Sequence, residues 1–260
     1  MWLSLHRLRL TEPGAPPFIG VEAYGVVLRD PLFWTDLGRT LLLVALTVPV
    51  ELLLGLAIAL VLRRPGRGRG LVRAATLVPY GVVTVVSAYA WRYAFALDTG
   101  FVNGWLGLGE VAWFDHPATA LAAICVAEVW KTTPFMALLL LPGLATVPEE
   151  LEEAAELDGA GAWQRLWRVT LPAMRGPLGV AVLFRALDAY RVFDAIFVMT
   201  GGANGTETVS FLAYRQVVTR TALGLGATVS ILVFAAMLLL AGALAAALRP
   251  ERPEPSGADA

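Results

Sequence analysis

The feature that most constrains this chain is a run of 28 residues, Thr221 to Leu248, that contains no acidic or basic side chain. A helix of about 20 mostly apolar residues is long enough to cross a bilayer. The whole chain is 57% hydrophobic and 16% charged, whereas average soluble domains are about 45–50% apolar and about 25% charged. We therefore expect an all-α, polytopic membrane protein built as a helical bundle.

Five apolar segments are predicted to span the membrane. They cover residues 37–62, 71–95, 117–144, 177–199 and 221–248. The segment 177–199 is the least apolar, because Arg185, Asp188, Arg191 and Asp194 interrupt it; opposite charges three residues apart on a helix can neutralise one another. Residues 1–36 are predicted to be an external segment, and residues 249–260 a disordered tail rich in proline and charge.

The distribution of basic residues between the loops predicts the orientation of these spans. One set of loops holds ten arginines, and the opposite set holds five, or six with Arg39. The richer set is expected to be cytoplasmic, which places the C-terminus in the cytoplasm. Five spans then leave the N-terminus outside. Because residues 1–5 are also similar to the last turn of a helix, we expect a first span to be missing.

The composition also excludes several functions. The only lysine, Lys131, follows Trp130 and not a glycine-rich loop, so the chain has no phosphate-binding P-loop. One cysteine and two histidines are too few for a structural zinc site. The net charge of −1 offers no field that would recruit nucleic acid. No cofactor, metal or catalytic residue is therefore predicted for this chain.

A predicted cytoplasmic segment, residues 148–172, has the pattern of two short helices joined by a turn. Acidic residues follow Pro148 and favour a helix N-terminus, and Asp158-Gly159 breaks that helix. The second helix carries Trp163 and Trp167 and is expected to end at Pro172. From these residues alone, the hairpin either contacts a partner protein or lies on the membrane surface with its tryptophans in the interface.

The same segment resembles the EAA loop of binding-protein-dependent ABC importer permeases. The family pattern has Phe and Ile where this chain has Leu166 and Val169, and the other positions match. The resemblance implies a type I permease fold, a transmembrane domain over 37–248, and a loop that docks in a cleft of a dimeric cytoplasmic ATPase, which binds ATP and Mg²⁺. The coupling residues that it implies are Glu153, Ala154, Ala155, Asp158, Gly159, Ala160, Leu166, Leu171 and Pro172.

Further motifs resemble the carbohydrate branch of these permeases. They include the run from Trp130 to Phe135, Phe193-Asp194 and Thr200-Gly201-Gly202, and from Trp2 to about Leu248 the chain is similar to the first permease subunit of mycobacterial-type trehalose importers. The resemblance implies a bacterial cell-membrane permease for a disaccharide, with trehalose favoured over maltose-type sugars. The implied partners are a second homologous permease, the ATPase and an extracytoplasmic sugar-binding protein.

Charged residues inside the predicted spans are candidates for the substrate pathway. Each charged residue costs about 2.5–3.5 kcal/mol at the centre of a spanning helix on insertion scales, so these side chains are expected to face the bundle interior, a water-filled cavity or one another. The predicted pairs are Arg185–Asp188, Arg191–Asp194 and Glu128–Lys131, which either lock helices together or line the pathway. The pathway candidates are Glu128, Trp130, Lys131, Asp188, Tyr190, Arg191 and Asp194.

Two other features leave alternatives open. Glu51, close to Pro49 in the first predicted span, either forms part of a gate or makes a hydrogen bond between helices. The buried carboxylates also fit an ion-coupled transporter or channel, and less well an intramembrane enzyme that would use Asp188 and Asp194. The match to the EAA loop argues against both.

Overall fold

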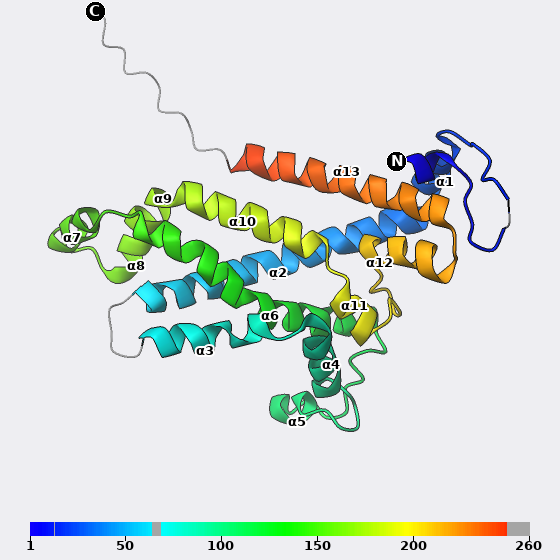
Figure 1. The fold of residues 1–260 in the computed structure, drawn as a ribbon. Helices are drawn as coiled ribbons and strands as arrows, with labels where there is room; N and C mark the ends of the chain where they lie inside the picture. Colours follow the sequence, from blue (N-terminus) through cyan, green and yellow to red (C-terminus); the bar gives the residue numbers. More distant parts are fainter. Residues whose placement is uncertain (13, 64–68, 249–260) are drawn as a thin grey trace, which may run out of the picture.

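The computed structural model describes residues 1–12, 14–63 and 69–248, which form helices and connecting turns and contain no strand beyond an isolated bridge between His6 and Phe18. Figure 1 shows the long helices α2 (Pro31–Arg63), α6 (Pro117–Ala145), α10 (Arg175–Tyr190) and α13 (Leu223–Ala247) running side by side. The predicted all-α bundle is confirmed. The tail at 249–260, predicted to be disordered, lies outside the described residues.

Three of the five predicted spans each coincide with one continuous helix that is long and apolar enough to cross a membrane, namely α2, α6 and α13. Helix α2 begins at Pro31, before the predicted span at 37–62, and α1 (Glu22–Arg29) precedes it. Asp30 Oδ1 accepts a hydrogen bond from the Leu32 backbone N–H at 2.9 Å. An aspartate followed by proline is a typical helix start, since the carboxylate satisfies a free N–H and proline has none to lose.

The predicted span 71–95 is divided into two helices. Helix α3 (Arg69–Gly81) and helix α4 (Thr84–Ala94) are bent by 84° at Val82 and Val83, and they qualify as a span only as a bent pair. Pro79 lacks the N–H that would bond one turn back, which weakens the end of α3. After α4, the short α5 (Val102–Leu106) extends from the bundle (Figure 1).

The predicted span 177–199 is not a continuous helix either. Helix α10 ends at Tyr190 and α11 (Asp194–Met199) begins after a three-residue break. By length and composition this segment does not qualify as a span. Arg191 therefore lies in the break and Asp194 begins α11, so the two side chains do not share one helix face.

The hairpin predicted over 148–172 is present at one end of the bundle, which we call the hairpin end (Figure 1). It contains α7 (Glu149–Leu157), α8 (Ala162–Arg165), the π-helix η2 (Leu166–Thr170) and α9 (Leu171–Ala173). Gly159 between α7 and α8 has φ +81°, a conformation that side chains rarely allow. The prediction that Pro172 ends the second helix is wrong. Pro172 lies in the first turn of α9, where a missing N–H is tolerated, and the chain turns at Met174.

Small residues allow the central helices to approach closely. A Cβ atom added to Gly55 in α2 would lie 2.8 Å from Met136 Cγ and 3.1 Å from the Ala137 backbone N in α6. Met136, Ala137 and Leu140 are fully buried at this contact. At the opposite end of the bundle, α13 packs against the remaining elements, η1 (Trp2–Leu5), α12 (Val209–Tyr214) and the π-helix η3 (Arg215–Thr219).

Candidate functional site

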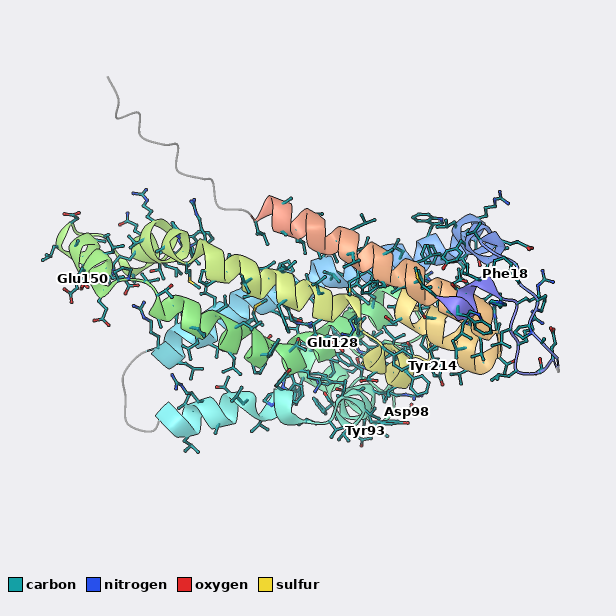
Figure 2. All side chains as sticks on the ribbon, turned by 45° about the horizontal axis from the view of Figure 1, so that its top comes forward. Phe18, Tyr93, Asp98, Glu128, Glu150 and Tyr214 are labelled. Atoms are coloured by element: carbon teal, nitrogen blue, oxygen red, sulfur yellow. The ribbon has the colours of Figure 1, made fainter. Side chains whose placement is uncertain are left out.

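A polar cavity of about 590 Å³ lies where the bend between α3 and α4 faces α6 and the end of α10. In Figure 2, Glu128 lies along the middle of the bundle, between Glu150 at the hairpin end and Phe18 at the opposite end. Tyr80 and Phe193 add aromatic rings to the lining. The charged side chains of the lining are Glu128, Lys131, Arg185, Asp188, Arg191 and Asp194.

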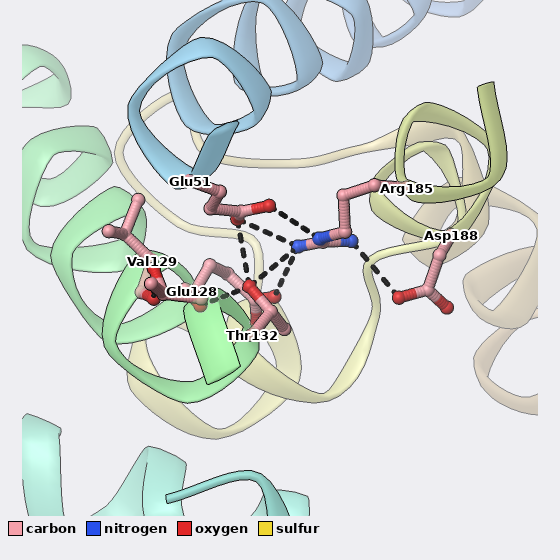
Figure 3. Close-up of polar contacts among 7 residues, drawn as sticks. Glu51, Glu128, Val129, Thr132, Arg185 and Asp188 are labelled. Carbon is pink, nitrogen blue, oxygen red and sulfur yellow. Dashed lines mark hydrogen bonds and ion pairs between the residues drawn. The ribbon is translucent and has the colours of Figure 1, made fainter. Parts of the chain in front are cut away.

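Arg185 connects three helices at one wall of this cavity (Figure 3). Its Nε and Nη2 atoms lie 2.5 and 2.9 Å from the Glu51 carboxylate oxygens, and Nη2 also donates to Thr132 Oγ1 at 2.9 Å. Nη1 donates to Asp188 Oδ2 at 3.0 Å, and Glu128 Oε2 lies 4.0 Å from Nη2. Arg185 and Glu51 are fully buried, whereas half of the Asp188 side chain is exposed. One guanidinium group thus neutralises several carboxylates that would be costly to bury alone.

The sequence identified only part of this network. The predicted Arg185–Asp188 pair is confirmed, and so is the hydrogen bond between helices predicted for Glu51, because Thr132 Oγ1 in α6 lies within bonding distance of Glu51 Oε1 at 2.8 Å. The bidentate Arg185–Glu51 pair was missed. The two residues are 134 positions apart, and no local pattern indicates that α2 and α10 place them together.

Lys131 does not form the ion pair predicted with Glu128. Its Nζ donates to the Val82 carbonyl oxygen at 2.6 Å and lies 3.5 Å from that of Tyr80. The break after Gly81 leaves the last carbonyl groups of α3 without partners in a helix. The ammonium group bonds the Val82 carbonyl group in the bend and approaches that of Tyr80 in the last turn of α3, and it thereby joins α6 to the bend between α3 and α4.

The other pathway candidates divide into two groups. Arg191 and Asp194 line the cavity, and within the described part of the chain no ion pair joins them. Tyr190 is fully buried and donates to the Val233 carbonyl oxygen at 3.2 Å, and Trp130 packs against Trp91. Neither Tyr190 nor Trp130 is part of the cavity lining. Among the described residues, no group of His, Cys, Asp and Glu side chains could hold a metal ion.

The implied coupling residues also differ in their surroundings. Glu153, Ala154, Asp158 and Gly159 are exposed, and Ala155 and Ala160 are partly buried. Leu166 and Leu171 are partly buried against the main apolar core, and Pro172 is partly buried. The exposed residues of α7 and its turn are therefore open to contact from outside, whereas the leucines attach the hairpin to the bundle.

Two ion pairs at the opposite end of the bundle were not predicted. Arg39 Nη1 lies 3.0 Å from Asp36 Oδ1, and Arg215 Nη1 lies 2.9 Å from Glu207 Oε2. Burial raises the pKa of the Glu207 carboxyl above its usual value, although the Arg215 and Arg39 guanidinium groups act in the opposite direction. The first pair lies within α2, and the second joins the loop before α12 to η3.

Comparison with known proteins identifies the family. The family model described as "Binding-protein-dependent transport system inner membrane component" matches residues 51–252, which include α2 from Glu51 onward, the cavity and the hairpin. The chain belongs to this family. The permease fold inferred from the EAA-type motif is thereby confirmed, and the chain is a membrane permease subunit of a binding-protein-dependent transport system.

Individual relatives agree with this assignment. The permease is 47% identical to the trehalose transport system permease protein SugA of Mycobacterium tuberculosis, over 93% of this chain and 78% of the relative. It is 41% identical to the trehalose/maltose transport system permease protein MalF of Thermococcus litoralis, over 91% and 81%. A solved bacterial ABC transporter involved in the import of alginate has a similar fold, with a TM-score of 0.78 at 22% identity over 91% of this chain and 86% of that chain.

Proposed function

We propose that this permease forms half of the translocation pathway of an ATP-driven importer for an uncharged disaccharide, trehalose first, in the bacterial cell membrane. The observation that carries the proposal is the polar cavity at mid-length of the bundle, in a chain that is 47% identical to a trehalose permease. A second homologous permease would complete the pathway. An ATPase dimer would supply ATP hydrolysis, and a sugar-binding protein would deliver the substrate.

The chemistry of the cavity fits a sugar. Hydroxyl groups both donate and accept hydrogen bonds, and the carboxylates of Asp188 and Asp194 are acceptors beside the donor Arg191. Phe193 offers an apolar ring face on which a pyranose can lie. Lys131 is already bonded to the Val82 carbonyl group, so we assign it to the wall and not to the substrate.

The coupling proposal follows from the hairpin. We place the hairpin end and the C-terminus in the cytoplasm, where the ATPase would contact Glu153, Ala154, Asp158 and Gly159. The segment from α8 through η2 and α9 leads directly into α10, which carries Arg185 and Asp188. Closure of the ATPase would therefore move the helix that forms one wall of the cavity and expose the cavity alternately to the two sides.

The test is sugar-stimulated ATPase activity and uptake by the complete complex in lipid vesicles. We expect stimulation by trehalose and loss of coupling in Gly159→Asp. Gly159→Asn is the control for backbone strain, since asparagine tolerates positive φ. Gly161→Asp is the control for added charge, because Gly161 has φ −66° and nothing lies within 4 Å of a Cβ atom added there. Proton-driven uptake by this chain alone would contradict the proposal in favour of an ion-coupled transporter.

A further inference from the structure

The hairpin is attached to the bundle at a second place, which lies outside the EAA-type motif. Arg63, the last residue of α2, donates from Nη1 to Glu152 Oε1 in α7 at 2.7 Å. Thr170 in η2 has its Oγ1 atom 3.1 Å from the same Oε1. One carboxylate oxygen therefore joins three elements, α2, α7 and η2.

This contact is not a loose surface pair. The side chains of Arg63 and Glu152 are 25% and 27% exposed, and Thr170 is buried. Helix α7 has no buried residue at all, so it has no apolar anchor of its own. The polar contact at Glu152 therefore carries much of the attachment of α7 to the rest of the protein.

A neighbouring pair offers an internal comparison. Glu156 of α7 pairs with Arg165 of α8, but its side chain is 69% exposed and both residues belong to the hairpin. That pair can stabilise the hairpin, but among the described residues no hydrogen bond or ion pair connects it to a membrane helix. Glu152 differs from Glu156 because its partner is the end of α2.

We propose that Glu152 is a positioning residue that transmits movement of α7 to α2 through Arg63. The proposal rests on the proposed function, in which an ATPase contacts the hairpin. Helix α2 carries Glu51 and α10 carries Arg185, whose ion pair closes one wall of the cavity. A hairpin attached to both helices moves the two sides of that ion pair together, whereas a hairpin attached to α10 alone would pull them apart.

The experiment measures sugar molecules transported per ATP hydrolysed in the complete complex reconstituted in vesicles. The variants are Glu152→Gln, Arg63→Gln and the exchange Arg63→Glu with Glu152→Arg, with Glu156→Gln as the matched control. We expect each single variant to lower the transport ratio about fivefold, equal to about 1 kcal/mol. The exchange should recover most of the loss, and Glu156→Gln should match the unmodified complex.

The amount of ATPase that co-purifies with each variant separates positioning from docking. We expect Glu152→Gln to retain the ATPase at the unmodified level. Three results would each overturn the proposal. They are loss of the ATPase from the Glu152→Gln complex, a transport ratio for Glu152→Gln equal to that of Glu156→Gln, and no recovery of the ratio in the exchange variant. If trehalose and other disaccharides fail to stimulate the ATPase activity of the unmodified complex, the proposed function itself is wrong. If they stimulate it but Glu152→Gln leaves the transport ratio unchanged, only the role of Glu152 is refuted.

Discussion

Arg185 in α10 and Glu51 in α2 face each other inside the bundle, with Arg185 Nε 2.5 Å from Glu51 Oε2 and neither side chain more than 1% exposed. A buried ion pair of this kind is weak evidence for stability, because removing two ions from water offsets much of their attraction. Its importance here is positional, since it fixes α2 against α10 beside Thr132 and Asp188.

Removing Arg185 should be more harmful while Glu51 is charged than when it is neutral. We expect Arg185→Met alone to destabilise the folded permease by about 3–5 kcal/mol, because it leaves the buried Glu51 carboxylate uncompensated. Glu51→Gln should cost less, because Asp188 still pairs with Arg185, and the double variant should be more stable than Arg185→Met. Thermal unfolding of the purified permease in detergent measures the effect, and simple addition of the two losses would contradict it.

Lys131→Met should loosen the bend between α3 and α4. The substitution leaves the Val82 carbonyl group without its donor, at a cost of about 1–3 kcal/mol. Nitroxide labels at the exposed residues Val78 and Val86, in a Cys125→Ser background, would report a broader distance distribution. Lys131→Arg keeps a donor and is the control; equal widths for Lys131→Met and the unmodified chain would show that the lysine does not hold the bend.

Gly55→Ala and Gly242→Ala should change stability in opposite directions. At Gly55 the new methyl group meets Met136 and the α6 backbone at about 3 Å, and overpacking of this kind costs about 1–3 kcal/mol. An added Cβ at Gly242 in α13 meets nothing within 4 Å, so alanine should gain about 0.5–1 kcal/mol of helix stability. Melting temperatures of the two variants in detergent compare them directly, and equal shifts would refute the close contact between α2 and α6.

Asp194→Asn tests the cavity as the sugar site. Hydrogen bonds to charged groups contribute about 1.5–3 kcal/mol, so loss of this carboxylate should raise the half-saturating sugar concentration for uptake by about tenfold or more. Asp98→Asn, at an exposed carboxylate that is not part of the cavity lining, should leave uptake unchanged. The idea fails if the two variants are indistinguishable in an uptake assay with the complete complex.

The local patterns were strong enough to predict the apolar helices and the hairpin. Long runs such as 221–248 have no stable place in water, and Asp158-Gly159 indicates a turn wherever it occurs, so these elements do not depend on distant contacts. Helix α2 extends beyond the apolar run at 37–62, because Asp30-Pro31 starts the helix earlier in the chain.

The sequence by itself determined the helical membrane class, the family and the position of the hairpin, because periodicity, charge bias and motif spacing are local properties. Only the tertiary structure decided which charges meet. Glu51 reaches Arg185, Lys131 reaches the Val82 carbonyl group and Arg63 reaches Glu152, each across long stretches of chain. Buried charges take whatever partner the helix packing places within reach, and that packing depends on contacts such as Gly55 against Met136 that no local pattern specifies.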